Sequence, residues 1–156
     1  MICPCVRVNF WKCTFGLSKS FYVCTCEQFT HTHTHRYGKQ RNEWNAVVAC
    51  FFIDTAPNIF EYMEVIERIL KPGGLLISIG PLQFHWADGG NDERYNRSIE
   101  MSYDEIKHVI QSYGFEFIHE ERRMCTYARN PESMQQSAYH AVQFTARKVV
   151  KTKKKI

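Results

Sequence analysis

The chain has 156 residues, of which 44% are hydrophobic and 23% charged, and its formal net charge is +4 at pH 7. This length and hydrophobic content are enough for one ordinary globular domain with its own core. No run of 18 or more apolar residues occurs, and the N-terminus lacks the pattern of a secretory signal, so we predict no membrane span. We expect a cytoplasmic protein that could also enter the nucleus, with mostly reduced cysteines.

The charge is distributed unevenly along the chain. Residues 1–40 hold five basic residues and one acid, Glu27, whereas residues 147–156 hold six basic residues and no acid. The acids therefore concentrate in the middle of the chain. The basic tail, residues 149–156, could contact RNA, anionic lipid or an import receptor. A frayed terminus in solvent is the simpler interpretation, so we expect neither nucleic acid nor a membrane as partner.

The first 40 residues differ in character from the rest. They contain five of the seven cysteines and the tract "THTHTHR", in which histidines alternate with threonines. Structural zinc sites usually have two to four residues between paired cysteines and three to five between paired histidines. Neither spacing occurs here, so we predict no metal site. We interpret residues 1–40 as a low-complexity, Cys/His-rich segment without a fold of its own.

A strand, a helix and a second strand are predicted next. Residues 44–53, "WNAVVACFFI", are a nearly continuous apolar run typical of a strand buried on both faces. "PNIFEYMEVIERIL" has apolar residues at helical spacing, with Asn58 and Glu61 placed as a capping pair. "KPGG" then ends the helix, because Pro72 cannot continue it and the two glycines tolerate positive φ. With the strand "LLISIG" at residues 75–80, this predicts a right-handed βαβ unit.

The last third of the body predicts one helix and two antiparallel strands. Ser102 and Glu105 form a capping box ahead of "SYDEIKHVIQSYG", and Gly114 ends that helix. Residues 115–127 and 139–150 alternate apolar and polar side chains, as antiparallel strands do. We expect most apolar residues of these elements to form the core.

Several longer strings in this region resemble one family. "CFFIDTA", "ILKPGG", "GPLQFHW", "IEMSYDEIKHVIQSYGF" and "CTY" before the last strand are similar to carnosine N-methyltransferases, over about residues 42–148. The resemblance implies the second half of a Rossmann-like class I methyltransferase sheet with a terminal antiparallel hairpin, so the fold class is α/β, with an irregular segment at residues 1–40 and a partial methyltransferase domain at residues 41–148. It also implies S-adenosylmethionine as methyl donor, carnosine as the peptide converted to anserine, and a homodimer for the full-length family.

The resemblance implies three substrate-binding residues: Asp54 in "CFFIDTA", His85 in "GPLQFHW" and Tyr139 in "SAYHAVQF". All three lie where predicted elements end, as ligand-binding residues of open α/β sheets do. An imidazole attacks the methyl group through its unprotonated nitrogen, and a carboxylate that accepts a hydrogen bond from the other ring N–H would fix the tautomer. Asp54 is the candidate for this catalytic role.

Each of these residues has a simpler interpretation. Asp54 could cap the helix that begins near Asn58, because aspartate is common before a helix. His85 could be an ordinary loop residue, and Tyr139 could belong to the core. The residue types leave open whether His85 and Tyr139 orient the imidazole ring or the rest of the dipeptide.

The donor-binding half of such an enzyme has no clear counterpart in the sequence. A class I methyltransferase holds its donor with a glycine-rich turn after the first strand and an acid at the end of the second. No Gly-x-Gly turn occurs before residue 44, since Gly16 is isolated and Gly38 lies in a polar stretch. Cofactor-binding residues therefore cannot be assigned. We expect a truncated form of the enzyme that lacks its donor site.

Without the family's first strand, residues 46–53 are expected to form an open sheet edge. "VRVNFW" or "SFYVCTC" could pair there instead, because both alternate like strands. Two other interpretations stay open at this point. The chain could be a small working enzyme completed by another chain, or a non-enzymatic binding module that uses its basic tail.

Overall fold

The structure is a computed structural model, and it describes residues 21–25, 39–87, 89–127 and 130–150. Four of the five N-terminal cysteines, the "THTHTHR" tract and the last six residues lie outside this part of the chain, whereas Cys24 lies within residues 21–25. The elements, in chain order, are β1 (Phe21–Thr25), β2 (Trp44–Cys50), the 3-10 helix η1 (Ile53–Thr55), α2 (Ile59–Ile69), β3 (Leu70–Gly80), α3 (Glu93–Asn96), α4 (Tyr103–Ser112), β4 (Phe115–Tyr127) and β5 (Ser137–Lys148).

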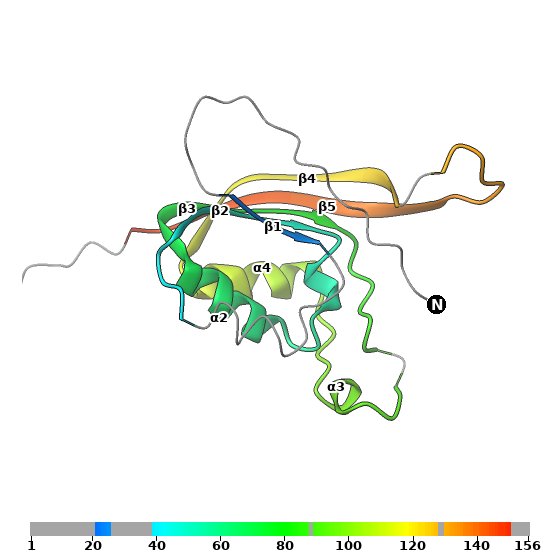
Figure 1. Cartoon of the computed structure of the whole chain (residues 1–156), viewed down its shortest axis with the longest axis horizontal. Helices are drawn as coiled ribbons and strands as arrows, with labels where there is room; N and C mark the ends of the chain where they lie inside the picture. Colours follow the sequence, from blue (N-terminus) through cyan, green and yellow to red (C-terminus); the bar gives the residue numbers. More distant parts are fainter. Residues whose placement is uncertain (1–20, 26–38, 88, 128–129, 151–156) are drawn as a thin grey trace, which may run out of the picture.

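The strands form one five-stranded sheet in the order β1-β2-β3-β5-β4. β1, β2 and β3 run parallel, whereas β5 lies antiparallel between β3 and β4. Helices α2 and α4 lie side by side against one face of the sheet, and α3 belongs to a loop that extends away from it (Figure 1). The predicted strand–helix–strand order and the terminal antiparallel pair are confirmed.

One expectation about the N-terminal segment was wrong. The backbone of residues 21–25 forms β1, which pairs in parallel with β2 from Phe21 opposite Ala46 to Thr25 opposite Cys50. The residues "FYVCT" thus supply the neighbour of β2, which was the alternative left open for "SFYVCTC", and residues 1–40 are not irregular throughout. The physical reason is that an apolar strand with unpaired N–H and C=O groups gains backbone hydrogen bonds from any extended segment that reaches it.

The helix-to-strand junction differs from the prediction in its details. α2 passes directly into β3 at Leu70, and "KPGG" lies inside β3 rather than before it. The register against β2 shifts there, between the pairs Trp44–Leu70 and Ala46–Leu75. Gly73 takes the positive φ of 79° that was predicted. The two glycines therefore form an irregularity within a strand and leave the pairing with β2 intact on both sides.

The core lies between the sheet and the two long helices. Its largest fully buried side chains come from β2, β3, α2, α4 and the turn after β2: Phe52, Met63, Ile69, Leu70, Leu76, Ile106, Ile110 and Val47. The helix starts follow the predicted caps. Asn58 accepts a hydrogen bond from the Phe60 N–H, and Ser102 and Glu105 form the complete capping box. Glu61 differs from the prediction, because its side chain pairs with Arg97.

A buried lysine joins the end of β5 to the end of α2. Lys148 is only 8% exposed. Its Nζ donates to the Leu70 carbonyl at 2.8 Å and to the Asn42 side chain at 3.3 Å, and it lies 3.1 Å from a carboxylate oxygen of Glu67. A cation at the C-terminal end of a helix satisfies carbonyl groups that have no partner within the helix. Lys148 therefore fixes the position of β5 relative to α2.

Candidate functional site

The candidate site begins with a sharp turn at the carboxyl end of β2. Phe51 has a φ of +50°, an uncommon conformation for a bulky residue. Its N–H donates to the Ile79 carbonyl at 2.7 Å, and its Cα lies only 3.1 Å from where a Cβ on Gly80 would stand. The strand therefore ends at Cys50, three residues before the predicted end at Ile53, and the chain turns into η1.

Asp54 lies in η1 and is 3% exposed. Its Oδ2 accepts a hydrogen bond from the Gln83 main-chain N–H at 2.9 Å. Burial raises the pKa of Asp54 above its ordinary value of 3.8, while the Gln83 hydrogen bond and the nearby His85 oppose that rise. Because Asn58 is the residue that caps α2, helix capping does not account for Asp54.

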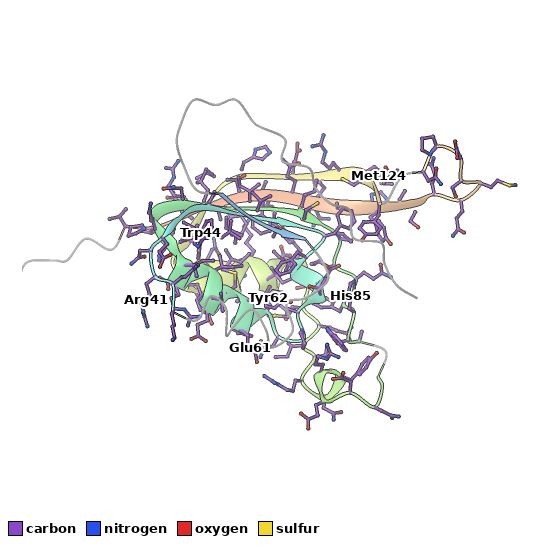
Figure 2. The ribbon with its side chains drawn as sticks, viewed as in Figure 1. Arg41, Trp44, Glu61, Tyr62, His85 and Met124 are labelled. Atoms are coloured by element: carbon purple, nitrogen blue, oxygen red, sulfur yellow. The ribbon has the colours of Figure 1, made fainter. Side chains whose placement is uncertain are left out.

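His85 lies beside η1 on the segment that follows β3 (Figure 2). Its main-chain N–H donates to the Asp54 carbonyl at 3.1 Å, and its side chain is exposed. The next residue, Trp86, donates its indole Nε1–H to the Thr55 carbonyl at 3.0 Å. With the Gln83 bond, three hydrogen bonds join residues 83–86 to η1. The structure thus brings Asp54 and His85 together from two different connections of the sheet.

Tyr139 lies at the same edge of the sheet but on another element. β3 ends where Gly80 pairs with Val142, so Tyr139 stands on the part of β5 that continues past β3. Its half-buried ring lies 5.8 Å from the ring of Phe51, edge to face, and the ring of Tyr127 lies 4.9 Å from that of Phe51. Phe51 therefore links Tyr139 to the turn that carries Asp54.

Phe51, Tyr127 and Trp86 were not identified from the sequence. The alternation of β4 and the apolar run of β2 predict strands but do not reveal which rings meet across the sheet. Only the offset between β3 and the longer β4–β5 hairpin would have signalled that Tyr127 and Tyr139 extend past the end of β3. That offset depends on the register, which the sequence pattern alone does not give.

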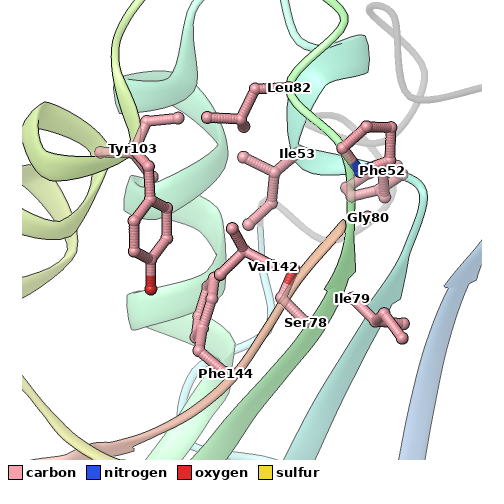
Figure 3. A pocket seen from close by; sticks show the side chains of 11 residues that line it. Phe52, Ile53, Ser78, Ile79, Gly80, Leu82, Tyr103, Val142 and Phe144 are labelled. Carbon is pink, nitrogen blue, oxygen red and sulfur yellow. The ribbon is translucent and has the colours of Figure 1, made fainter. Parts of the chain in front are cut away.

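A small cavity lies next to this edge. It measures about 20 Å³ and is lined by residues of the turn, the end of β3, α4 and β5, among them Ile53, Gly80, Leu82 and Tyr103 (Figure 3). That volume holds about one water molecule and is far too small for a dipeptide or a methyl donor. Cys50 and His85 are exposed at the carboxyl edge next to this cavity.

The fold is that of a class I S-adenosylmethionine-dependent methyltransferase. A crystal structure of such an enzyme from Methanosarcina mazei matches with a TM-score of 0.51 at 12% sequence identity, covering 71% of this chain and 62% of that one. A likeness at this identity shows the fold. In such open α/β sheets, ligands bind outside the carboxyl ends of the strands. Asp54, His85 and Tyr139 all stand at that edge.

The sequence comparisons give the family. The carnosine N-methyltransferase family model matches residues 12–150. Carnosine N-methyltransferase of Rattus norvegicus is 44% identical over 108 residues, which are 69% of this chain and 26% of that protein. The Dictyostelium discoideum protein of the same name is 42% identical over 100 residues, 64% of this chain and 20% of its own length. The chain belongs to the carnosine N-methyltransferase family.

Two features of the match concern its extent along this chain and along the relatives. The family model begins at residue 12, so much of the segment at residues 1–40 also matches the family, although the resemblance had been placed from residue 42 onward. The chain also spans only about a quarter of the length of the rat relative.

The described residues fit the acceptor side of a methyltransferase site better than the donor side. A buried carboxylate, an exposed imidazole and several aromatic rings gather at the carboxyl edge. The donor of the class lies against a glycine-rich turn after the first strand. After β1, however, the first glycine in the sequence is Gly38, so this glycine-rich turn has no counterpart in the residues described.

Among the described residues, no cluster of three or more His, Cys, Asp or Glu side chains could hold a metal ion, and no helix is long and apolar enough to cross a membrane.

Proposed function

We propose that this edge binds the imidazole of a histidine-containing dipeptide, carnosine, and orients it for methylation to anserine. The observation that carries the proposal is the placement of Asp54: a carboxylate that is 3% exposed, held by the Gln83 N–H and adjacent to His85. A buried carboxylate costs free energy unless it is compensated. A ligand N–H that reaches the ionised form would supply that compensation.

Asp54 would bind one ring nitrogen of the substrate. An ionised carboxylate accepts several hydrogen bonds, so the bond from Gln83 to Oδ2 leaves acceptor capacity for an imidazole N–H. That contact fixes the tautomer and leaves the lone pair of the other nitrogen free to attack. S-adenosylmethionine, when bound, supplies the methyl group. As the ring becomes positively charged, attraction to Asp54 strengthens, which favours the transition state over the ground state.

His85 and Tyr139 would hold the rest of the substrate. The exposed imidazole of His85 can pair with the substrate carboxylate, whereas the hydroxyl of Tyr139 can donate or accept a hydrogen bond. The ring of Tyr139, packed against Phe51, also offers an aromatic wall for the imidazole. Correct placement of the attacking nitrogen supplies much of the rate in such a transfer.

Saturation-transfer NMR with carnosine tests the mode of binding. We expect the ring protons of carnosine to receive more saturation from the protein than the β-alanyl protons, and Asp54→Asn to abolish the effect. Asp104→Asn, at an exposed position in the first turn of α4, is the matched control and should behave like the wild type. Saturation confined to the β-alanyl protons, or an unchanged signal in Asp54→Asn, would overturn the proposal.

A second experiment tests the reaction itself. The protein is incubated with carnosine and S-adenosylmethionine labelled in its methyl group, and the peptide is analysed by mass spectrometry. A protein that holds both ligands should carry the label on an imidazole nitrogen of the dipeptide, and Asp54→Asn should lose it by about 100-fold or more. Label on the β-alanyl amine would contradict the assigned role of Asp54.

A further inference from the structure

We infer that Trp86 is a positioning residue of this site: its indole fastens residues 83–86 to η1 and thereby sets His85 relative to Asp54. The inference rests on the proposed function for its ligand, but its geometry concerns only contacts within this chain. Trp86 does not carry a group that suits methyl transfer, so its role is exerted through its neighbours.

The hydrogen-bond acceptor of the indole is itself firmly held. Trp86 donates to the carbonyl of Thr55, a residue that is 9% exposed. The Thr55 hydroxyl donates in turn to the Phe52 carbonyl at 2.7 Å, and Phe52 is 2% exposed. The indole is therefore bonded to a buried residue of the turn that carries Asp54, and that residue is itself bonded to the core residue Phe52.

Two side chains of α3, those of Arg94 and Tyr95, pack against the indole ring of Trp86. The guanidinium carbon of Arg94 lies 4.1 Å from the centre of the Trp86 ring, and the ring of Tyr95 lies 5.1 Å away, edge to face. Arg94 is oriented by Asp92, whose Oδ1 accepts a hydrogen bond from Nε at 2.9 Å. A cation over an indole face is favourable, the more so when the ring is partly shielded from water.

Close packing places Tyr95 against the ring. A Cβ on Gly90 would stand 2.4 Å from Cε2 of Tyr95, so this position has room only for glycine unless Tyr95 moves. Beyond α3, the Ile99 N–H donates to the Pro57 carbonyl at 3.0 Å, which ties the far end of this loop to the start of α2. The segment from residue 83 to 99 is thus attached to the Asp54 turn at both ends.

His85 is exposed and lies between two other residues of this segment whose bonds reach η1, Gln83 and Trp86. Gln83 and Trp86 are both joined to η1, and the His85 N–H donates to the Asp54 carbonyl, so the His85 backbone is held next to Asp54. Loss of the Trp86 bond would release one of the two anchors that flank His85. We expect the hydrogen bonds of Gln83 and His85 to Asp54 to open more often as a result.

Backbone amide exchange of Trp86→Phe tests this inference. Phenylalanine keeps an aromatic ring under Arg94 but cannot donate to Thr55. We expect the amides of Gln83 and His85 to exchange about threefold to tenfold faster, as the loss of one ordinary hydrogen bond implies. The control is Trp44→Phe, which also removes an indole hydrogen bond, from Nε1 to Gln40 at 2.8 Å, but at the start of β2. It should leave both amides unchanged.

Carnosine affinity supplies the functional part of the test. The dissociation constant should rise about threefold to tenfold in Trp86→Phe and stay unchanged in Trp44→Phe. If the wild type does not bind carnosine, the proposed function fails, whereas the exchange measurement still decides the role of Trp86. Should Trp86→Phe fold poorly, Trp86→Met serves instead, because it keeps a large apolar side chain and also lacks the Nε1–H that donates to Thr55. Unchanged exchange at Gln83 and His85 in the folded variant would overturn the inference.

Discussion

The main-chain N–H of His85 donates a hydrogen bond to the main-chain carbonyl of Asp54 over 3.1 Å, although the two residues follow different strands. A second bond, from the Gln83 N–H to the Asp54 carboxylate, reinforces this link. The connections after β2 and β3 therefore form one unit at the carboxyl edge of the sheet. The predictions that follow depend on this unit.

Asp54→Asn is expected to stabilise the fold while it removes function. Asparagine keeps an oxygen that can accept from the Gln83 N–H but carries no charge to be buried. Burial raises the pKa of Asp54 in the folded state above its ordinary value of 3.8. The protonated side chain therefore contributes fully to the free energy of unfolding below its ordinary pKa of 3.8, and this contribution is lost as the pH rises through the folded-state pKa. Urea unfolding should therefore show the variant gaining stability over the wild type between pH 4 and pH 7. A variant less stable than the wild type at pH 7 would contradict this account.

Tyr139→Phe separates the two roles left open for that side chain. If the hydroxyl binds the substrate, the dissociation constant for carnosine should rise about fivefold to tenfold, with the melting temperature almost unchanged. If the ring alone matters, only Tyr139→Ala should weaken binding, because it also removes the packing against Phe51. Equal affinity in all three proteins would exclude Tyr139 from the site.

Gly80→Ala tests the turn that presents Asp54. The new methyl group would stand 3.1 Å from the Cα and 3.3 Å from the N of Phe51, both main-chain atoms that cannot rotate away. We expect a loss of about 1–3 kcal/mol in the free energy of unfolding, together with weaker carnosine binding. Chemical denaturation and calorimetric titration measure the two effects. A variant that matches the wild type in both would show that the turn does not set the site.

Lys148→Met tests the buried cation that joins β5 to α2. The substitution keeps much of the side-chain volume but leaves the Leu70 carbonyl and the Glu67 carboxylate without this partner. We expect a loss of about 2–4 kcal/mol, because buried polar groups that lose their partner are costly. Lys107→Met is the control: it breaks a half-exposed pair with Glu120 and should cost about 1 kcal/mol or less. Similar losses in both variants would contradict the role assigned to Lys148.

The parts of the fold that depend on local sequence were predictable. The helices around Met63 and Ile106, their caps at Asn58 and Ser102, and the alternating strands β4 and β5 all follow from spacing within a short stretch of chain. β1 was only one of two segments that could pair at the edge of β2, because that pairing depends on contact between segments far apart in the chain. The pattern of "FYVCT" allows a strand but does not name its neighbour.

The candidate site was predictable only in part. The family strings led to Asp54, His85 and Tyr139, and the structure places the first two in contact. Phe51 and Trp86 were missed because their importance lies in a backbone angle and in a bond to a distant carbonyl. Neither feature leaves a pattern in the sequence, since phenylalanine and tryptophan are ordinary residues in apolar runs and loops.

The most direct test of the central claim is calorimetric titration of carnosine into the wild type and into Asp54→Asn, with a thermal melt of each protein. We predict saturable binding to the wild type and none to Asp54→Asn, although the variant melts at the same temperature or higher. Equal binding by both folded proteins would show that Asp54 does not hold the substrate, and the proposed site would have to be abandoned.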